Sequence, residues 1–369
     1  MVNQLLYRKI EAAIRERIKN GTYPPGAQLP TEMELLKEFK TSRLTISKSL
    51  SHLVAEGLIT RTRGKGSFVK GSTATARPGL IRFVSPVAGD DNNILRNGLL
   101  EGIHESVHPA GFSVGIEFYR SLQEELDILR RCRDHENDAL VIWPSNDAAV
   151  MEILRELKLN DFPFVLVDTF FPQLKCDCIM TDNILGGLIM LEHLAALGHK
   201  HVGYFSQALD RFSLAERFAG VLSAAGSLGI ELLGHTLILP GHSGMSTPHA
   251  GREERQKIAD WLKGQMQLPE PPTAILCSND SLALDLYEIL DEMNIKVPGD
   301  ISIAGFDNVS FGQYLPTPLT TMEHDFTEIG RKAGYFLLNR LQTPKETPLL
   351  QQDRVAPRLI TRSSTQKRS

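Results

Sequence analysis

The sequence predicts an α/β protein with two parts, an N-terminal winged helix-turn-helix domain and a larger, two-lobed α/β domain. Residues 1–70 contain two short helical patterns followed by a hairpin pattern, with 13 Lys and Arg against 6 Asp and Glu. From residue 80 to residue 365, short apolar runs alternate with helical stretches, which is typical of βαβ units on a parallel sheet. Residues 71–79 are small and polar and end in Pro-Gly, so we expect a linker there.

The N-terminal domain is expected to contain three helices. Apolar residues recur every four positions from Leu6 to Ile18, as on the buried face of an amphipathic helix. Thr31 and Glu34 have the spacing of a capping box, which predicts the start of a second helix. Ser42 is a suitable N-cap for a third helix, whose apolar positions follow at helical spacing. The second and third helices, joined by a tight turn, would form a helix-turn-helix.

A hairpin is expected to complete this domain as a wing, with strands on either side of Gly64-Lys65-Gly66. A winged helix-turn-helix places the start of its second helix in the major groove of DNA, while basic residues hold phosphates. Each basic residue taken alone is equally compatible with a solvated surface charge, but their shared placement favours contact with DNA. The residues expected to face DNA are Thr31, Glu32, Ser42, Arg43, Thr45, Ser47, Lys48, Arg61, Arg63, Gly64, Lys65 and Gly66.

Residues 3–70 resemble the gntR family of bacterial regulators. The matching segments are Leu29-Pro30-Thr31-Glu32, the run from Ser42 to Ser47, and Gly64-Lys65-Gly66-Ser67-Phe68-Val69. This resemblance implies a domain that binds operator DNA. The family usually has Arg where this chain has Ser47, so one base or phosphate contact is expected to be missing or to pass to Lys48.

The cysteines and the apolar runs limit the remaining possibilities. Four scattered cysteines are too few for a disulfide framework and lack a zinc-binding spacing, which fits a reducing cytoplasm. The N-terminus begins an amphipathic helix rather than a signal peptide, and no apolar run approaches the ~18 residues of a membrane span. We therefore expect a cytoplasmic protein without a cofactor, a metal site or a membrane partner.

The βαβ units after residue 80 are too numerous for one sheet of ordinary size, so we expect two lobes with crossovers near residues 181 and 308. Several segments of this region resemble the effector-binding domain of the LacI family, which shares its fold with periplasmic sugar-binding proteins. With the gntR-like domain, they resemble the arabinose repressor group. The segments include Thr181-Asp182-Asn183, Arg217-Phe218-Ala219-Gly220, Ser278-Asn279-Asp280, Gly305-Phe306-Asp307, Pro318-Leu319-Thr320-Thr321 and the run from Arg358 to Thr365.

Candidate effector ligands follow from the same organisation, because open α/β sheets bind ligands beyond the carboxyl ends of their strands. Trp143, Asp168, Asn279 and Asp307 each follow an apolar run, and the resemblance adds Arg217. Carboxylate, amide and guanidinium groups beside aromatic faces suit a sugar, whose hydroxyls donate and accept and whose C–H faces stack on rings. The aromatic candidates are Trp143, Phe170, Phe171 and Phe212. The alternative roles are helix or strand capping for Asp168 and Asn279 and core packing for the rings.

The combined expectation is a sequence-specific transcription regulator, a repressor acting as a homodimer on an inverted repeat of double-stranded operator DNA and controlled by a small sugar effector. A solute-binding protein and a regulator that senses a non-sugar metabolite are alternatives. An enzyme is disfavoured, because the chain has no nucleophile elbow, phosphate-cradling glycine loop or metal-ligand cluster. Whether the protein represses or activates depends on operator position, which the chain does not encode.

Overall fold

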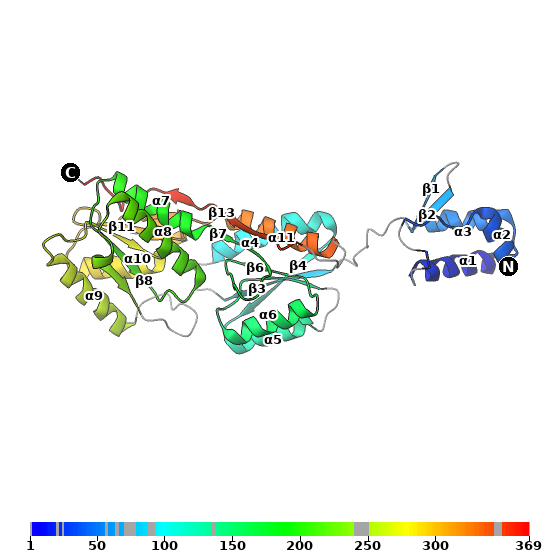
Figure 1. Ribbon diagram of the computed structural model, residues 1–369, viewed down its shortest axis with the longest axis horizontal. Helices are drawn as coiled ribbons and strands as arrows, with labels where there is room; N and C mark the ends of the chain where they lie inside the picture. The colour runs from blue at the N-terminus through cyan, green and yellow to red at the C-terminus, as the bar shows by residue number, and fades with distance from the viewer. Residues whose placement is uncertain are drawn as a thin grey trace. The chain divides into compact units, whose positions relative to one another are not determined.

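Two units make up the chain, Met1–Arg77 and Pro78–Ser369 (Figure 1). The structure is a computed structural model that describes residues 2–19, 22–23, 26–55, 58–62, 66–69, 79–87, 93–133, 138–239, 251–342 and 349–368. Residues 71–78 of the predicted linker therefore lie outside the described residues. None of the described helices is both long and apolar enough to cross a membrane.

The first unit is a winged helix-turn-helix, as predicted. It contains α1 (Val2–Lys19), α2 (Glu32–Phe39), α3 (Arg43–Ala55) and an antiparallel pair of strands, β1 (Ile59–Thr62) and β2 (Gly66–Val69). The turn between α2 and α3 is tight because the chain takes a left-handed conformation directly after α2. The apolar residues recognised in the sequence form one core, which includes Ile10, Ile14, Leu35, Ile46, Leu50, Leu53, Ile59 and Val69.

The second unit consists of two lobes, each with a six-stranded sheet between two layers of helices (Figure 1). In the first lobe, α4 (Asn93–Val107) and α11 (Phe326–Gln342) pack on one face of the sheet, and α5 (Leu122–Arg133) and α6 (Ala148–Leu159) on the other. All its strands are parallel, in the order β13 (Gln352–Val355), β7 (Asp177–Thr181), β6 (Phe164–Val167), β5 (Ala139–Ile142), β3 (Leu80–Pro86) and β4 (Ser113–Tyr119).

The second lobe repeats this plan. Helices α7 (Asn183–Ala196) and α8 (Phe212–Leu228) cover one face of its sheet, and α9 (Arg252–Met266) and α10 (Asp280–Glu292) cover the other. Among the described strands of this sheet, only the edge strand β14 is antiparallel to its neighbour. The order is β14 (Arg358–Ile360), β12 (Thr320–Glu323), β11 (Ser302–Phe306), β10 (Ala274–Cys277), β8 (Val202–Ser206) and β9 (Thr236–Ile238).

Within the described ranges, the chain passes between the lobes three times, at residues 181–183, 323–326 and 355–358. The predicted crossover near residue 308 is wrong, because β11 and β12 are neighbouring strands of the second sheet and the chain turns back at Asp307 without leaving the lobe. The third crossing was not predicted, since β13 is mostly exposed and lacks an apolar run. The second lobe also continues past the predicted end at residue 365, where the amide of Arg368 donates to the carbonyl of Leu197 at 2.7 Å.

Glycines allow α7 and α8 to pack with their backbones in close contact. A Cβ atom on Gly220 would lie only 2.1 Å from the carbonyl oxygen of Ile184, so the helices would have to separate. We expect Gly220→Ala to lower the free energy of unfolding by ~1–3 kcal/mol, measured by urea denaturation. Gly226→Ala on the same helix is the control: its Cβ meets no atom within 4 Å, so it should be neutral or slightly stabilising. Equal losses for the two variants would contradict this packing argument.

Candidate functional site

Glu32 connects two of the three arginines that were predicted to face DNA, Arg43 and Arg61. It is the first residue of α2, and its Oε2 lies 3.4 Å from Nε of Arg43, the first residue of α3. Its other carboxylate oxygen forms an ion pair with Arg61 of β1 in the wing. The Arg43 side chain is nevertheless 82% exposed, so the pairing aligns it without removing it from solvent. The start of α3 and strand β1 thus place two guanidinium groups beside the Glu32 carboxylate.

The other predicted DNA-facing residues of the helices divide between structural and exposed positions. Thr31 is the N-cap of α2, and its capping box with Glu34 is present, with the Thr31 amide 2.7 Å from Glu34 Oε2. Thr45 is buried, and its hydroxyl lies 2.8 Å from that of Ser42, which argues against a direct contact of Thr45 with DNA. Lys48 is exposed, with Nζ 4.7 Å from the centre of the Tyr7 ring.

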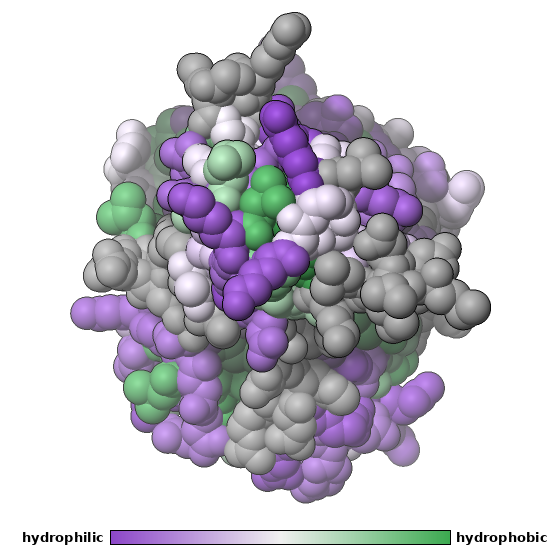
Figure 2. Space-filling model, turned by 90° about the vertical axis from the view of Figure 1, so that its right-hand side faces the viewer, coloured by the Kyte–Doolittle hydropathy of each residue, from purple (hydrophilic) through white to green (hydrophobic). Residues whose placement is uncertain are grey.

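Ser47 and the wing complete the predicted set. The carbonyl of Ser47, which is partly exposed, accepts a hydrogen bond from Ser51 on the next turn. Gly66 begins β2 with φ of 118°, a conformation that favours glycine. On the face that Figure 2 shows, hydrophilic residues surround a small hydrophobic patch. Arg63, Gly64 and Lys65 lie outside the described residues.

Three of the five predicted effector ligands meet between the lobes of the second unit. Arg217 extends from α8, and Asp307 follows β11; Arg217 Nη1 lies 3.1 Å from Asp307 Oδ1. Asp168 follows β6 of the first lobe, and its charge interacts with those of Arg217 and Asp307. The guanidinium of Arg217 also donates to Asn183 Oδ1 at 2.9 Å and to the carbonyl of Ser278 at 2.7 Å. These contacts hold the Arg217 side chain in one orientation.

The two carboxylates of this group have opposite electrostatic environments. Burial raises the pKa of Asp168, whose Oδ1 is inaccessible and has no hydrogen-bond partner among the described residues. Burial also acts to raise the pKa of Asp307, but the nearby Arg217 and a hydrogen bond from His324 outweigh it and lower that pKa. Asp307 is therefore a stable anion, whereas Asp168 is a carboxylate that lacks a donor. A ligand hydroxyl would supply that donor.

His324 belongs to the same group and was missed in the sequence. Its Nε2 lies 2.9 Å from Asp307 Oδ1 and 3.3 Å from Arg217 Nη2, while its Nδ1 lies 2.6 Å from Thr181 Oγ1. Thr181 and His324 lie at two of the three crossings between the lobes. The His324 side chain therefore connects both crossings to Arg217 and Asp307. His324 directly follows β12, and the rule that selected Asp168 and Asp307 would have selected it once that strand was recognised. We call Asp168, Arg217, Asp307 and His324 the polar cluster.

Trp143 and Asn279, by contrast, have structural roles. Asn279 is the N-cap of α10, with Oδ1 accepting from the amide of Leu282 at 2.9 Å. The Trp143 ring packs on Phe326, with 5.6 Å between ring centres, and its carbonyl accepts from the Tyr119 hydroxyl at 2.9 Å. These contacts match the alternative capping and packing roles.

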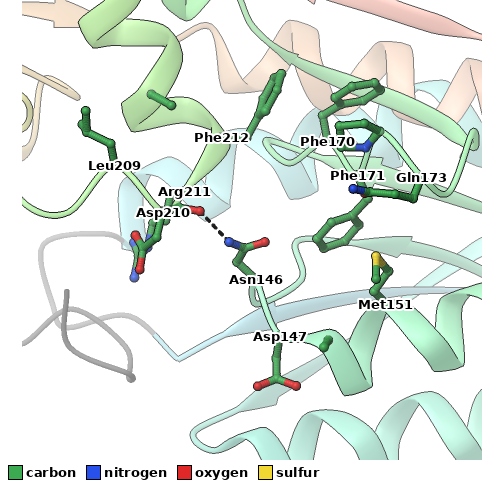
Figure 3. A pocket seen from close by; sticks show the side chains of 13 residues that line it. Asn146, Asp147, Met151, Phe170, Phe171, Gln173, Leu209, Asp210, Arg211 and Phe212 are labelled. Atoms are coloured by element: carbon green, nitrogen blue, oxygen red, sulfur yellow. Dashed lines mark hydrogen bonds between the residues drawn. The ribbon is translucent and has the colours of Figure 1, made fainter.

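A pocket of about 400 Å³ opens beside the polar cluster, between loops of the two lobes (Figure 3). None of the five predicted ligands lines it, but three of the predicted aromatic residues do. Asn146 Nδ2 of the first lobe donates to the carbonyl of Asp210 of the second lobe at 2.5 Å across the pocket. The lining residues are Asn146, Asp147, Ala148, Met151, Phe170, Phe171, Pro172, Gln173, Leu209, Asp210, Arg211, Phe212 and Ala215.

No group of three or more His, Cys, Asp or Glu that could hold a metal ion occurs within the described part of the chain. His193 and His199 instead make hydrogen bonds with residues that are distant in the sequence. His193 Nε2 lies 3.0 Å from the Thr365 hydroxyl, and His199 Nδ1 lies 2.8 Å from that of Thr273. These hydrogen bonds connect the helix α7 end of the second lobe to the C-terminal segment and to the residue that precedes β10.

The unpartnered carboxylate leads to a prediction for Asp168→Asn. Asparagine tolerates the left-handed φ of 51° and carries no charge, so the variant should be more stable than the wild type by ~1 kcal/mol without effector. Because the folded-state pKa of Asp168 is raised, the wild type loses stability as pH rises through that pKa. The gain should therefore be largest at alkaline pH and vanish at acidic pH in calorimetric scans. Asp161→Asn, exposed and with φ of 55°, is the control; the same gain there would contradict the assignment.

Comparisons with known proteins match each unit separately. Residues 6–69 match the model of bacterial regulatory proteins of the gntR family, and residues 191–365 match that of the periplasmic binding protein-like domain. The chain is 26% identical to the arabinose metabolism transcriptional repressor of Geobacillus stearothermophilus over 98% of both chains.

Solved structures resemble the second unit. The LacI family transcriptional regulator from Enterococcus faecium with bound ribose is 24% identical, with a TM-score of 0.61 over 78% of this chain and all of that one. The transcriptional regulator CelR in complex with cellobiose is 17% identical, with a TM-score of 0.64 over 88% of this chain and 92% of that one. The chain therefore joins a gntR-family DNA-binding domain to a periplasmic binding protein-like domain with the fold of LacI-family regulators.

Proposed function

We propose that this protein is a cytoplasmic transcriptional repressor whose affinity for operator DNA falls when a sugar binds between the lobes of its second unit. The observation that carries the effector part is the polar cluster, in which Asp168 of the first lobe faces Arg217 and Asp307 of the second. A ligand bound there contacts both lobes at once. The repressors and sugar complexes among the similar proteins support the same function.

The DNA-binding role is assigned to residues 1–70, with residues 71–79 as linker and residues 80–365 as the main part of the effector domain. Arg43 at the start of α3 is proposed to contact bases, while Lys48, Arg61 and the wing contact phosphates. Glu32 holds Arg43 and Arg61 in place before DNA arrives. The Glu32 carboxylate also repels DNA phosphates unless the two arginines leave it to contact the DNA. This repulsion favours binding to the specific site over binding to random DNA.

The switch is proposed to act through the crossings. Closure of the lobes on a ligand moves residues 181–183 and 323–326, which His324 and Thr181 connect to the polar cluster. In a dimer, that motion changes how the lobes pair and thereby the spacing of the two winged helices. Coupling of this kind is reciprocal and typically amounts to ~1–3 kcal/mol.

We expect the working unit to be a homodimer on an inverted repeat, because one winged helix offers only a small module's contacts to DNA. Sedimentation velocity at micromolar concentration should give a dimer, and a full inverted repeat should bind far more tightly than a half-site. A monomer that binds a single half-site as tightly as the full repeat would show that the proposed symmetry is wrong.

Two other functions fit parts of the chain. A solute-binding protein would need the two lobes, but its function would not require a domain that matches the gntR family of regulators. An activator would use both units, and only the position of the operator distinguishes it from a repressor. A non-sugar metabolite remains an alternative effector, which the ligand screen below addresses.

The test combines a ligand screen with DNA titration. Thermal shift of the full chain against mono- and disaccharides identifies effectors, because a ligand that binds only the folded state raises the unfolding temperature. Fluorescence anisotropy then follows binding of a labelled operator, selected from genomic fragments, with and without that sugar. We expect sugar to weaken operator binding; a sugar that binds without changing operator affinity would refute the proposed regulation.

A further inference from the structure

A short motif in the first lobe belongs to neither the DNA-binding nor the effector site. Residues 104–108 read His104-Glu105-Ser106-Val107-His108. Two histidines four positions apart, with a glutamate after the first, form the pattern with which zinc-dependent proteases bind their metal on a helix. A match of this length also arises by chance, so the pattern is a starting point for examining how the fold places the two rings.

The two histidine rings lie side by side at the end of α4. His104 is in the last turn of this helix, and His108 begins the 3-10 turn His108–Ala110 that follows it directly. The ring centres are 4.8 Å apart, with an angle of 37° between the planes. Both residues are exposed, and neither ring has a hydrogen-bond or ion-pair partner among the described residues. Two imidazole groups are therefore available to the same ligand from solvent.

The surroundings of this histidine pair favour a cation. The last turn of a helix carries a partial negative charge from its carbonyl groups, and both histidines lie at that end of α4. Glu101 is exposed and lies three positions before His104, on the same side of the helix. Imidazole is a preferred ligand of divalent zinc, nickel and copper ions. Two rings at this spacing can bind one such ion together.

Glu105 does not complete the protease pattern. Its Oε2 lies 3.0 Å from Nη2 of Arg331, so the carboxylate is paired with the neighbouring helix α11. A catalytic zinc site also takes three protein ligands, and the residues described here contain no group of three His, Cys, Asp or Glu suited to a metal. Within this part of the chain, the motif therefore supports metal binding by two imidazoles rather than a hydrolytic site.

We propose that His104 and His108 form an exposed site for one divalent transition-metal ion that prefers imidazole, such as Zn²⁺, Ni²⁺ or Cu²⁺. Each ring supplies one nitrogen as a ligand, and water fills the remaining positions. This proposal departs from the expectation of a chain without a metal site, which rested on the spacing of the cysteines and on the absence of a recognised ligand cluster. The site goes beyond the proposed function, because it shares no residue with the polar cluster or the DNA-facing surface.

Isothermal titration calorimetry of the untagged full chain with Zn²⁺ measures this site. We expect His104→Gln and His108→Gln each to weaken the tightest Zn²⁺ site about tenfold or more, because one imidazole alone cannot chelate the ion. Glu105→Gln should change the affinity much less, since the Glu105 carboxylate is paired with Arg331. Mg²⁺, which prefers oxygen ligands, should not bind there.

His201→Gln is the matched control, because it makes the same substitution in another pair of neighbouring rings. His201 and His235 have ring centres 5.8 Å apart and meet edge to face at 79°, and Nδ1 of His235 lies 2.6 Å from Gln265 Oε1. This variant should keep the wild-type Zn²⁺ affinity.

Electron paramagnetic resonance with one equivalent of Cu²⁺ gives a second readout. The spectrum should show hyperfine splitting from two nitrogen ligands in the wild type and in His201→Gln. Both nitrogen ligands should not be retained in His104→Gln or His108→Gln.

Three results would overturn the site: no Zn²⁺ binding by the wild type, equal Zn²⁺ affinity in the wild type and both α4 variants, or an equal loss in His201→Gln. None of them bears on the response of operator binding to a sugar, so failure of this proposal is distinguishable from failure of the proposed function.

Discussion

Asp307→Ala is expected to bind operator as tightly as the wild type and to remain bound when saturating effector is added. Asp307 accepts hydrogen bonds from Arg217 and His324 and faces the place where a sugar's hydroxyls would lie. Removing its carboxylate takes away the ligand's expected partner, while Arg217 keeps its hydrogen bond to the carbonyl of Ser278 and the winged helix is untouched. An effector that lowers wild-type operator affinity by a coupling of ~1–3 kcal/mol should have no measurable effect on the variant.

Operator titration by anisotropy, with and without effector, measures this outcome. Unchanged binding without effector shows that the variant is folded. Asp260→Ala, which removes an exposed carboxylate from α9 of the same lobe, is the control and should respond normally. Asp307→Asn keeps one acceptor oxygen and should respond only at higher effector concentration. If Asp307→Ala releases DNA at the wild-type effector concentration, this carboxylate does not hold the effector.

Arg43→Ala should lower affinity for the cognate operator by ~1–3 kcal/mol and affinity for random DNA by much less. Arg43 begins α3, the helix that enters the major groove in this fold, and its guanidinium is exposed and aligned by Glu32. A bidentate contact with one base would account for the difference between the two DNAs.

The measurement is anisotropy on both duplexes over a range of salt concentrations. Lys37→Ala removes the same charge from α2 at a position outside the predicted contacts and should affect both duplexes slightly and equally. Equal losses for Arg43→Ala on cognate and random DNA would mean that Arg43 contacts only phosphate.

Local sequence patterns were sufficient to predict most helices and strands of the fold. The capping box of Thr31 and Glu34 needs only residues three positions apart, and it is present where predicted. The apolar runs of β5, β6 and β10 are buried on both faces, so their composition alone identified them as strands. The winged helix-turn-helix and the two-lobed α/β domain followed from such patterns.

The order of crossings and the composition of the site depend on contacts between distant residues. Asp307 ends an apolar run, but only the pairing of β11 with β12 shows that the chain stays in the second lobe there. His324 lies in a segment without a motif of its own, and its partners are 17, 107 and 143 positions away. Asn279 shows a second limit of the sequence. A polar residue directly after a strand can bind a ligand or cap the next helix, and its position alone does not distinguish the two roles.

The first lobe is completed by the end of the chain. Helix α11 and strand β13 come from residues 326–355, yet Phe326, Ile329, Leu337 and Val355 belong to the same core as Ile81 and Phe83. During translation, neither lobe can complete its core until the ribosome has synthesised nearly the whole chain. A nonsense codon anywhere between residues 80 and 325 would therefore leave the winged helix as the only part with a complete core. Such alleles would yield fragments that lack the proposed effector site.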